Sequence, residues 1–336
     1  ITGCVIGGAT VAMGFSRFFS ALFNTPVLST ALVMLIVVGI ILIAGVKETA
    51  SLTILFMGVE AAGLVIIIFI GLPYFGSINY LELTHGIKGV IEAGVLIFFG
   101  YLGFEGITRL AEETKNPEKN IPKAIILSLV ITTIIYILIG IAAVSVVPWG
   151  ELSQSEAPLA LVAERVFGEN SFLVLSIIAL FSTFNTALVM LLSGSRLIYG
   201  IAEQKALPGI FLSILKKTLT PWAAIVAVVL ASMVFLFLGD LKTIANLTNF
   251  TIFIVFIVVN ASVIYFRYNK PVEEGFKVPL NVGKFPLMPL LGIVTLMFMI
   301  VNLTFDVLIL GSVLVTLGIV FYFILNMNRK YQGKRA

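Results

Sequence analysis

Apolar residues fill the chain in ten long runs, and polar residues gather in the short stretches between them. Each run has about 17 to 25 residues, which matches the ~20 helical residues needed to cross a ~30 Å hydrocarbon core. A backbone inside lipid must satisfy its own hydrogen bonds, so this pattern predicts a bundle of transmembrane helices. The runs begin near Ile1, Val27, Leu52, Val90, Ala124, Phe172, Pro221, Phe250, Phe285 and Val307.

The composition excludes an ordinary soluble protein. Hydrophobic residues make up 60% of the chain and charged residues 11%, and the mean hydropathy is +1.13. Soluble domains carry roughly 25% charged residues. Strands of a membrane barrel would alternate polar and apolar residues over ~10 positions, and no segment shows that pattern. Because the connections are short, we expect one transmembrane domain over residues 1–336.

The positive charges indicate an orientation. Most of the 21 Lys and Arg residues follow the even-numbered runs, whereas only Lys88, Arg165 and Lys242 lie in the other loops and Arg17 lies inside a run. Cytoplasmic loops carry the excess of Lys and Arg in membrane proteins. We therefore expect the even-numbered loops and the C-terminus to face the cytoplasm from the cell membrane. The net charge of +4 reflects this topology and does not indicate nucleic-acid binding.

Residues that could carry catalysis are few. Cys4 is the only cysteine and His85 the only histidine. A single cysteine excludes an intramolecular disulfide and any cysteine-based metal cluster. The sequence contains no recognisable nucleophile–base pair or set of metal ligands. We therefore expect neither an enzyme nor a bound cofactor or metal.

The fourth run contains two glycines where a membrane helix should be continuous. Gly100 and Gly103 lie within Phe98–Glu105, among bulky apolar side chains. A glycine inside a helix costs roughly 1 kcal/mol relative to alanine. A break there frees backbone N–H and C=O groups at membrane depth, which is tolerated where they line a cavity or bind a polar group. The alternative is that the glycines let two helices pack closely.

Glu60 is the most unusual charged residue. It lies about 15 Å along its run from Ala50, near the middle of a ~30 Å core. An ionisable residue at that depth suggests a functional site, and burial favours the protonated carboxyl group. We therefore predict that Glu60 binds and releases a proton, with Ser182 or Thr183 across the helix interface. The alternatives are a permanently protonated Glu60, and hydroxyl groups that only bond back to the preceding turn.

Several motifs resemble those of amino acid–polyamine–organocation (APC) transporters. Phe98–Glu105 followed by Glu112–Ala124 is similar to the sixth helix of that family and the loop after it. Ser195–Ala202 with Leu207-Pro208, and Gly45–Ala50, resemble two further motifs at the expected distances. The resemblance spans essentially the whole chain and aligns the ten runs with helices three to twelve. It implies an N-terminally truncated transporter in which the first two helices are missing.

The resemblance also implies a fold. It predicts an all-α membrane protein with the five-plus-five inverted repeat of leucine-transporter type, of which ten of twelve transmembrane helices are present. The rest of the first repeat would occupy residues 1–72 and the second repeat residues 86–267. Two peripheral helices would occupy residues 285–327.

The substrate site implied by the resemblance lies at the break. Phe99 occupies the position of an aromatic gate, and Gly100, Tyr101 and Gly103 follow it. Cys4 belongs to the family's third helix, which borders the substrate, although an inert apolar cysteine is the alternative. Sodium-dependent relatives draw ion-coordinating oxygens from the segment that contains Ser182 and Thr183. Some proton-coupled members carry a lysine at the position of Glu60, so this chain departs from their pattern.

The function implied is a secondary active transporter that moves amino acids by alternating access and couples to protons. The alternatives are coupling to sodium, a polyamine or amine exchanger, and a channel or sensor built on the same bundle. The expected partners are an amino acid substrate, protons or sodium as the coupling ion, and the lipid bilayer.

Overall fold

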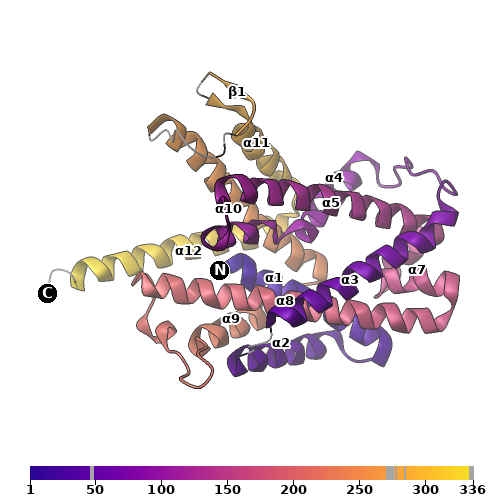
Figure 1. Cartoon of the computed structure of the whole chain (residues 1–336), viewed down its shortest axis with the longest axis horizontal. Coiled ribbons are helices and arrows are strands. Elements are labelled where there is room, and N and C mark those ends of the chain that lie inside the picture. The colour runs from indigo at the N-terminus through magenta and orange to yellow at the C-terminus, as the bar shows by residue number, and fades with distance from the viewer. Residues whose placement is uncertain (46–48, 270–275, 277, 284, 333–336) are drawn as a thin grey trace. The chain divides into compact units, whose positions relative to one another are not determined.

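The computed structural model is almost entirely helical (Figure 1). It describes the backbone of residues 1–45, 49–269, 276, 278–283 and 285–332, and their side chains except those of residues 49–53, 109–110, 112–113 and 324–332. The middle of the motif at Gly45–Ala50 therefore lies outside the described residues.

Each of the ten apolar runs contains a helix, which confirms the prediction of a helical bundle. In the described part of the chain, eight helical segments are long and apolar enough to cross a membrane, and α9 and α11 are shorter. The helices are α1 (Thr2–Phe23), α2 (Val27–Ala44), α3 (Thr49–Gly71), α4 (Gly86–Ile97), α5 (Pro117–Val146), α8 (Glu169–Glu203), α9 (Trp222–Phe235), α10 (Leu241–Asn269), α11 (Leu287–Val301) and α12 (Phe305–Gln332). The fourth run continues beyond α4 as two 3₁₀ segments, η2 (Phe98–Tyr101) and η3 (Phe104–Glu113).

The connections contain elements that the hydrophobic pattern does not predict. Between α5 and α8 lie α6 (Trp149–Gln154) and α7 (Pro158–Phe167), both too short to cross a bilayer. α7 packs against α3 and α8 and buries Val162 and Ala163. Three small elements complete the chain: η1 (Leu72–Tyr74), η4 (Gly209–Leu212) and a hairpin of β1 (Asn281–Val282) and β2 (Phe285–Pro286).

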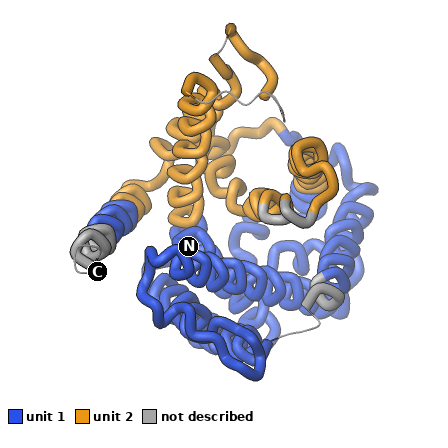
Figure 2. Tube along the Cα trace, turned by 60° about the vertical axis from the view of Figure 1, so that its left-hand side comes forward, with its two compact units in different colours: residues 1–80, 138–245, 313–336 blue, residues 81–137, 246–312 orange. Residues whose placement is uncertain are grey.

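The chain forms two compact units, which Figure 2 distinguishes by colour. α5, α10 and α12 contribute residues to both units. The division into repeats stays a prediction. Unit 1 consists of residues 1–80, 138–245 and 313–336, and unit 2 of residues 81–137 and 246–312.

Unit 1 is built around α1 and α8, which pack along each other. A Cβ atom on Gly8 would lie 2.6 Å from Cδ2 of Leu191, so a larger residue there would have to displace the Leu191 side chain. Close to the same glycine, the Ser232 hydroxyl of α9 donates a hydrogen bond to the Val5 carbonyl of α1 at 2.8 Å. These contacts hold α1, α8 and α9 together as a rigid support for α3 and α7.

Ion pairs join the loops at one end of unit 1. Arg17 of α1 approaches Glu156 with Nε and Oε2 at 3.2 Å, and Arg165 of α7 pairs with Glu151 of α6. Each of these side chains is between a third and a half exposed. Exposed pairs contribute little stability, so their main effect is to position α6 and α7.

Asp240 caps the start of α10. Its Oδ1 accepts a hydrogen bond from the backbone N–H of Thr243 at 2.9 Å. Hydrogen bonds from the side chain and backbone of Thr243 lower the pKa of Asp240, and Arg17 and Lys242 lower it further. Because the folded pKa is depressed, this contribution to stability is present above the ordinary Asp pKa of about 3.9 and is lost as pH falls through the folded value.

We expect Asp240→Ala to destabilise the protein by about 1 kcal/mol at neutral pH, as loss of a helix cap does. Thermal unfolding of the detergent-purified protein measures the difference, and Asp240→Asn is the control because it keeps an acceptor oxygen. The Ala variant and the wild type should converge as pH falls below about 4. A difference that does not change with pH would contradict the role of the ionised cap.

Candidate functional site

The helix break predicted from the two glycines is present in unit 2. α4 ends at Ile97, η2 begins at Phe98, and α-helical geometry does not resume before η3 ends. Gly103 has φ +125°, a backbone conformation that L side chains rarely adopt, with open space beside it. At this position glycine serves the backbone conformation and not close packing.

Two of the backbone groups at the break have side-chain partners within unit 2. The Tyr136 hydroxyl of α5 donates to the Gly100 carbonyl at 2.5 Å. Glu105 Oε2 accepts a hydrogen bond from the Gly103 N–H at 2.8 Å. These bonds satisfy polar groups that the interrupted helix cannot satisfy itself. Glu105 is therefore a structural residue at the start of η3.

Aromatic side chains surround the break. The Tyr101 hydroxyl donates to Thr133 Oγ1 of α5 at 3.1 Å, and its ring meets that of Tyr136 edge-on with centroids 5.2 Å apart. Phe98 packs on Phe253 of α10 with centroids 4.8 Å apart. Phe99 is half-buried. The position of the Tyr101 side chain is therefore set by its contacts with two residues of α5.

The predicted substrate-site residues fall in different units. Phe99, Gly100, Tyr101 and Gly103 lie together at the break in unit 2, and both glycines are exposed. Cys4 belongs to α1 in unit 1, where it is half-buried. A Cβ atom on Gly194 of α8 would lie 3.2 Å from its Cβ. Cys4 therefore lies where α1 approaches α8 closely.

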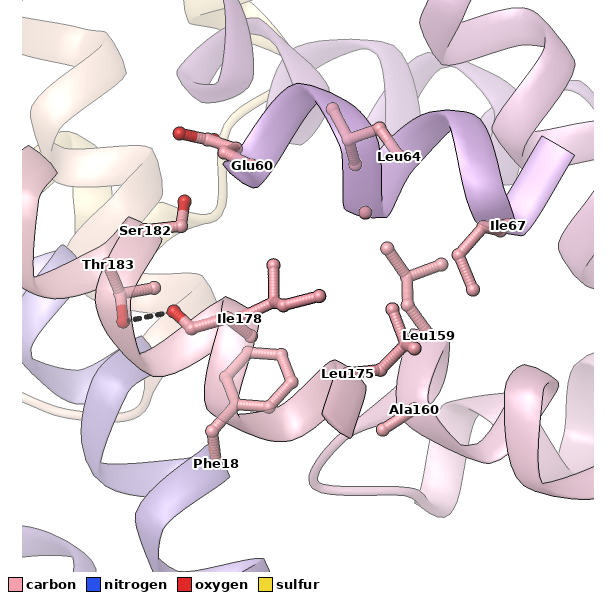
Figure 3. A pocket seen from close by; sticks show the side chains of 12 residues that line it. Phe18, Glu60, Leu64, Ile67, Leu159, Ala160, Leu175, Ile178, Ser182 and Thr183 are labelled. Atoms are coloured by element: carbon pink, nitrogen blue, oxygen red, sulfur yellow. Dashed lines mark hydrogen bonds between the residues drawn. The ribbon is translucent and has the colours of Figure 1, made fainter. Parts of the chain in front are cut away.

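The predicted coupling residues line one cavity in unit 1 (Figure 3). Its volume is about 190 Å³, and its walls are mostly apolar. Glu60 of α3 and Ser182 of α8 lie at the same end of it, as Figure 3 shows. The remaining lining residues are Phe18, Gly63, Leu64, Ile67, Leu159, Ala160, Leu175, Ile178, Ala179 and Thr183.

The two hydroxyl groups differ in what they bind. Thr183 Oγ1 donates to the Ala179 carbonyl one turn earlier at 2.7 Å, which is the back-bonding that the sequence left as an alternative. Ser182 Oγ has no hydrogen-bond partner among the described residues, and Glu60 has no ion-pair partner among them. Ser182 is therefore the hydroxyl that stays free to interact with Glu60. No cluster of His, Cys, Asp or Glu that could hold a metal occurs in the described part of the chain.

Sequence reasoning missed the residues that stabilise the break from other helices. Asn249 of α10 donates a hydrogen bond to the Val95 carbonyl at 2.8 Å, and Tyr136 of α5 holds Gly100. Each is a polar or amphipathic residue within an apolar helix, which is the one signal that could have singled them out. The acceptors of these hydrogen bonds are backbone carbonyls, which every residue has, so the sequence does not indicate which carbonyl is bound.

Comparison with known families identifies the chain. Over residues 1–325 it matches the family model described as Amino acid permease. The chain belongs to the amino acid permease family. The permease is thus a multi-span membrane protein of the APC superfamily, and its family consists of transporters and not enzymes. This confirms the predicted all-helical fold of leucine-transporter type.

Curated relatives of the permease carry different substrates. It is 28% identical over 318 residues to the branched-chain amino acid permease BcaP of Bacillus subtilis, covering 94% of this chain and 66% of the relative. It is 27% identical over 266 residues to the methylthioribose transporter of the same species, covering 77% and 56%. It is 32% identical over 230 residues to the cystine/glutamate transporter of Pongo abelii, covering 67% and 44%. The permease therefore spans from under half to about two thirds of the length of these relatives.

Proposed function

We propose that the permease moves amino acids across the cell membrane by alternating access and that protons drive the transport. The observation that carries this proposal is the break between α4 and η3 inside a segment apolar enough to cross the membrane. Transporters with interrupted helices bind their substrates at such breaks. The family match and the name of the branched-chain relative support an amino acid substrate.

The chemistry of the break suits a zwitterion. The carbonyl end of α4 carries the negative end of a helix dipole, which favours an ammonium group. At the N-terminal end of η3 the Gly103 N–H donates to Glu105, and the N–H groups that follow it favour a substrate carboxylate. Phe99 lies in η2, within the break. We assign it the role of aromatic gate, with Gly100, Tyr101 and Gly103 beside the substrate. Cys4 stays a predicted border residue.

The cavity beside Glu60 supports coupling to protons. Glu60 is an ionisable side chain that lines this mostly apolar cavity from within a transmembrane segment, where such a residue marks a functional site. The free Ser182 hydroxyl can donate to the ionised acid or accept from the neutral one. A sodium ion would need several oxygen ligands, and among the described residues that line the cavity only Glu60, Ser182 and Thr183 carry side-chain oxygen atoms. We therefore favour a proton over sodium.

We also propose how the chain is divided into repeats and oriented in the membrane. We propose that residues 1–336 form one transport domain, in which residues 1–72 are the rest of the first repeat, residues 86–267 the second repeat and residues 285–327 two peripheral helices. The Lys and Arg distribution supports a cytoplasmic C-terminus in the cell membrane.

Exchange of labelled solutes tests the substrate class. The purified protein is reconstituted in liposomes loaded with unlabelled leucine, glutamate, lysine or putrescine, and uptake of the same labelled solute is measured. We expect rapid exchange of at least one amino acid and none of putrescine. Exchange of putrescine alone would identify an amine exchanger, whereas solute flow without any dependence on internal solute would indicate a channel.

A further inference from the structure

Asn249 connects α10 to the end of α4. Its carboxamide Nδ2 lies 2.8 Å from the Val95 carbonyl oxygen and 3.5 Å from that of Leu96. The side chain is fully buried. Asn249 lies about 12 Å along α10 from Leu241, at 1.5 Å per residue, which is close to the middle of a ~30 Å core. The hydrogen bond therefore joins two helices near the middle of the membrane.

The acceptors of this bond belong to the last turn of α4. The last four carbonyls of an α-helix have no donor within the helix. Val95 and Leu96 immediately precede the change from α4 to η2 at Phe98. Asn249 thus supplies a donor to the carbonyl end of the helix at the point where the break begins.

The same face of α10 contacts both sides of the break. Phe253 and Phe256 follow Asn249 at helical spacing, so the three side chains form one stripe. Phe98, at the start of the break, packs on Phe253 and on Phe256, with centroids 4.8 and 6.4 Å away. Phe104, after the break, packs on Phe256 at 5.7 Å. In this stripe Asn249 is the residue whose side chain donates hydrogen bonds to α4.

Packing alone does not account for an asparagine at position 249, because burying its carboxamide group is energetically unfavourable. Its Oδ1 is buried without a hydrogen-bond partner among the described residues, as is Oδ1 of Asn246 one turn earlier. A buried acceptor without a donor is unfavourable, and an apolar side chain of similar size would avoid that cost. The hydrogen bonds that the carboxamide donates to the carbonyls of α4 offset this cost.

We propose that Asn249 is a positioning residue for transport. Its carboxamide fixes the carbonyl end of α4 against α10, so that the break keeps the geometry in which the substrate binds. The inference rests on the proposed function, because it assigns Asn249 to the same break. Asn249 acts through the backbone of α4 and does not itself touch the substrate.

Three variants separate positioning from folding. Asn249→Leu removes the donor at similar volume, and Asn249→Asp keeps the shape. Asn260→Leu is the matched control, because Asn260 lies in the same helix but donates to its own Phe256 carbonyl at 2.8 Å. Exchange of labelled amino acid at equal pH on both sides is the readout. We expect Asn249→Leu to lose about tenfold or more of the maximal exchange rate, with Asn260→Leu close to the wild type.

The exchange rate of Asn249→Asp should depend on pH in a way that would not be expected if Asn249 only filled space. A neutral carboxyl group has an O–H that can donate to the Val95 carbonyl, whereas an ionised carboxylate can only accept. We therefore expect exchange by Asn249→Asp to recover toward the wild-type rate as pH is lowered equally on both sides. Exchange by Asn249→Leu should show no such recovery.

Hydrogen–deuterium exchange of the full chain provides a readout without any transport. Amides of residues 98–106 should exchange faster in Asn249→Leu than in the wild type or Asn260→Leu, at unchanged melting temperature. Normal amide exchange together with normal transport in Asn249→Leu would overturn the inference. If the wild type exchanges no amino acid, the proposed function fails, and the amide measurement still decides whether Asn249 fixes the break.

Discussion

Glu60→Gln should abolish accumulation of amino acids driven by a pH gradient while leaving exchange of labelled substrate intact. Glutamine has nearly the shape of the protonated acid but cannot release a proton. Exchange requires only that the loaded protein reorients, whereas uphill uptake requires proton release on the inner side. Because Glu60 and Ser182 line the same cavity, Ser182→Ala should weaken uphill uptake in the same direction and to a smaller extent.

Uptake into liposomes with an imposed pH gradient measures this prediction, and counterflow in the absence of a gradient measures exchange. Glu118→Gln is the matched control, because Glu118 is exposed in the first turn of α5. Proton-driven accumulation by Glu60→Gln at the wild-type level would remove Glu60 from the mechanism. It would then be a structural residue beside an apolar cavity.

Gly100→Leu should eliminate binding of the substrate. A Cβ atom on Gly100 would already lie 3.3 Å from Cε2 and 3.4 Å from the hydroxyl of Tyr136, so a longer side chain must displace that ring. Tyr136 would then lose its hydrogen bond to the Gly100 carbonyl, and the break would change shape. We expect affinity to fall by at least about a hundredfold. Phe99→Ala should weaken binding less, because it only opens the gate.

Calorimetric titration of the purified protein with the transported amino acid measures these affinities. Gly140→Leu is the control, since Gly140 lies on α5 with nothing within 4 Å of its added Cβ. Circular dichroism must show that Gly100→Leu is folded. Wild-type affinity in both Gly100→Leu and Phe99→Ala would place the substrate site elsewhere.

The fold could be predicted to a large extent because the bilayer imposes one length and one polarity on every helix. All ten runs contain helices, and the break was visible because Gly100 and Gly103 contradict the surrounding pattern. α6 and α7 could not be predicted in the same way. They are too short to carry the membrane signal, and α7 is stabilised by packing of Val162 and Ala163 and not by its own length.

The candidate site was predicted less completely, because its contacts depend on residues far apart in the sequence. Glu60 and Ser182 were expected across one helix interface, and the structure places both on one cavity. The hydrogen bond from Thr183 to Ala179 depends on a rotamer that sequence does not specify. Asn249 and Val95 are 154 residues apart, and nothing local to either predicts their bond.

Proton-driven accumulation by the wild-type protein tests the central claim most directly. Liposomes containing the protein are diluted into acidic medium without sodium, and labelled amino acid inside is measured over time. The account predicts a transient internal concentration above the external one, which a protonophore abolishes and an added sodium gradient does not increase. Simple equilibration under the pH gradient, or accumulation only when sodium is supplied, would contradict it.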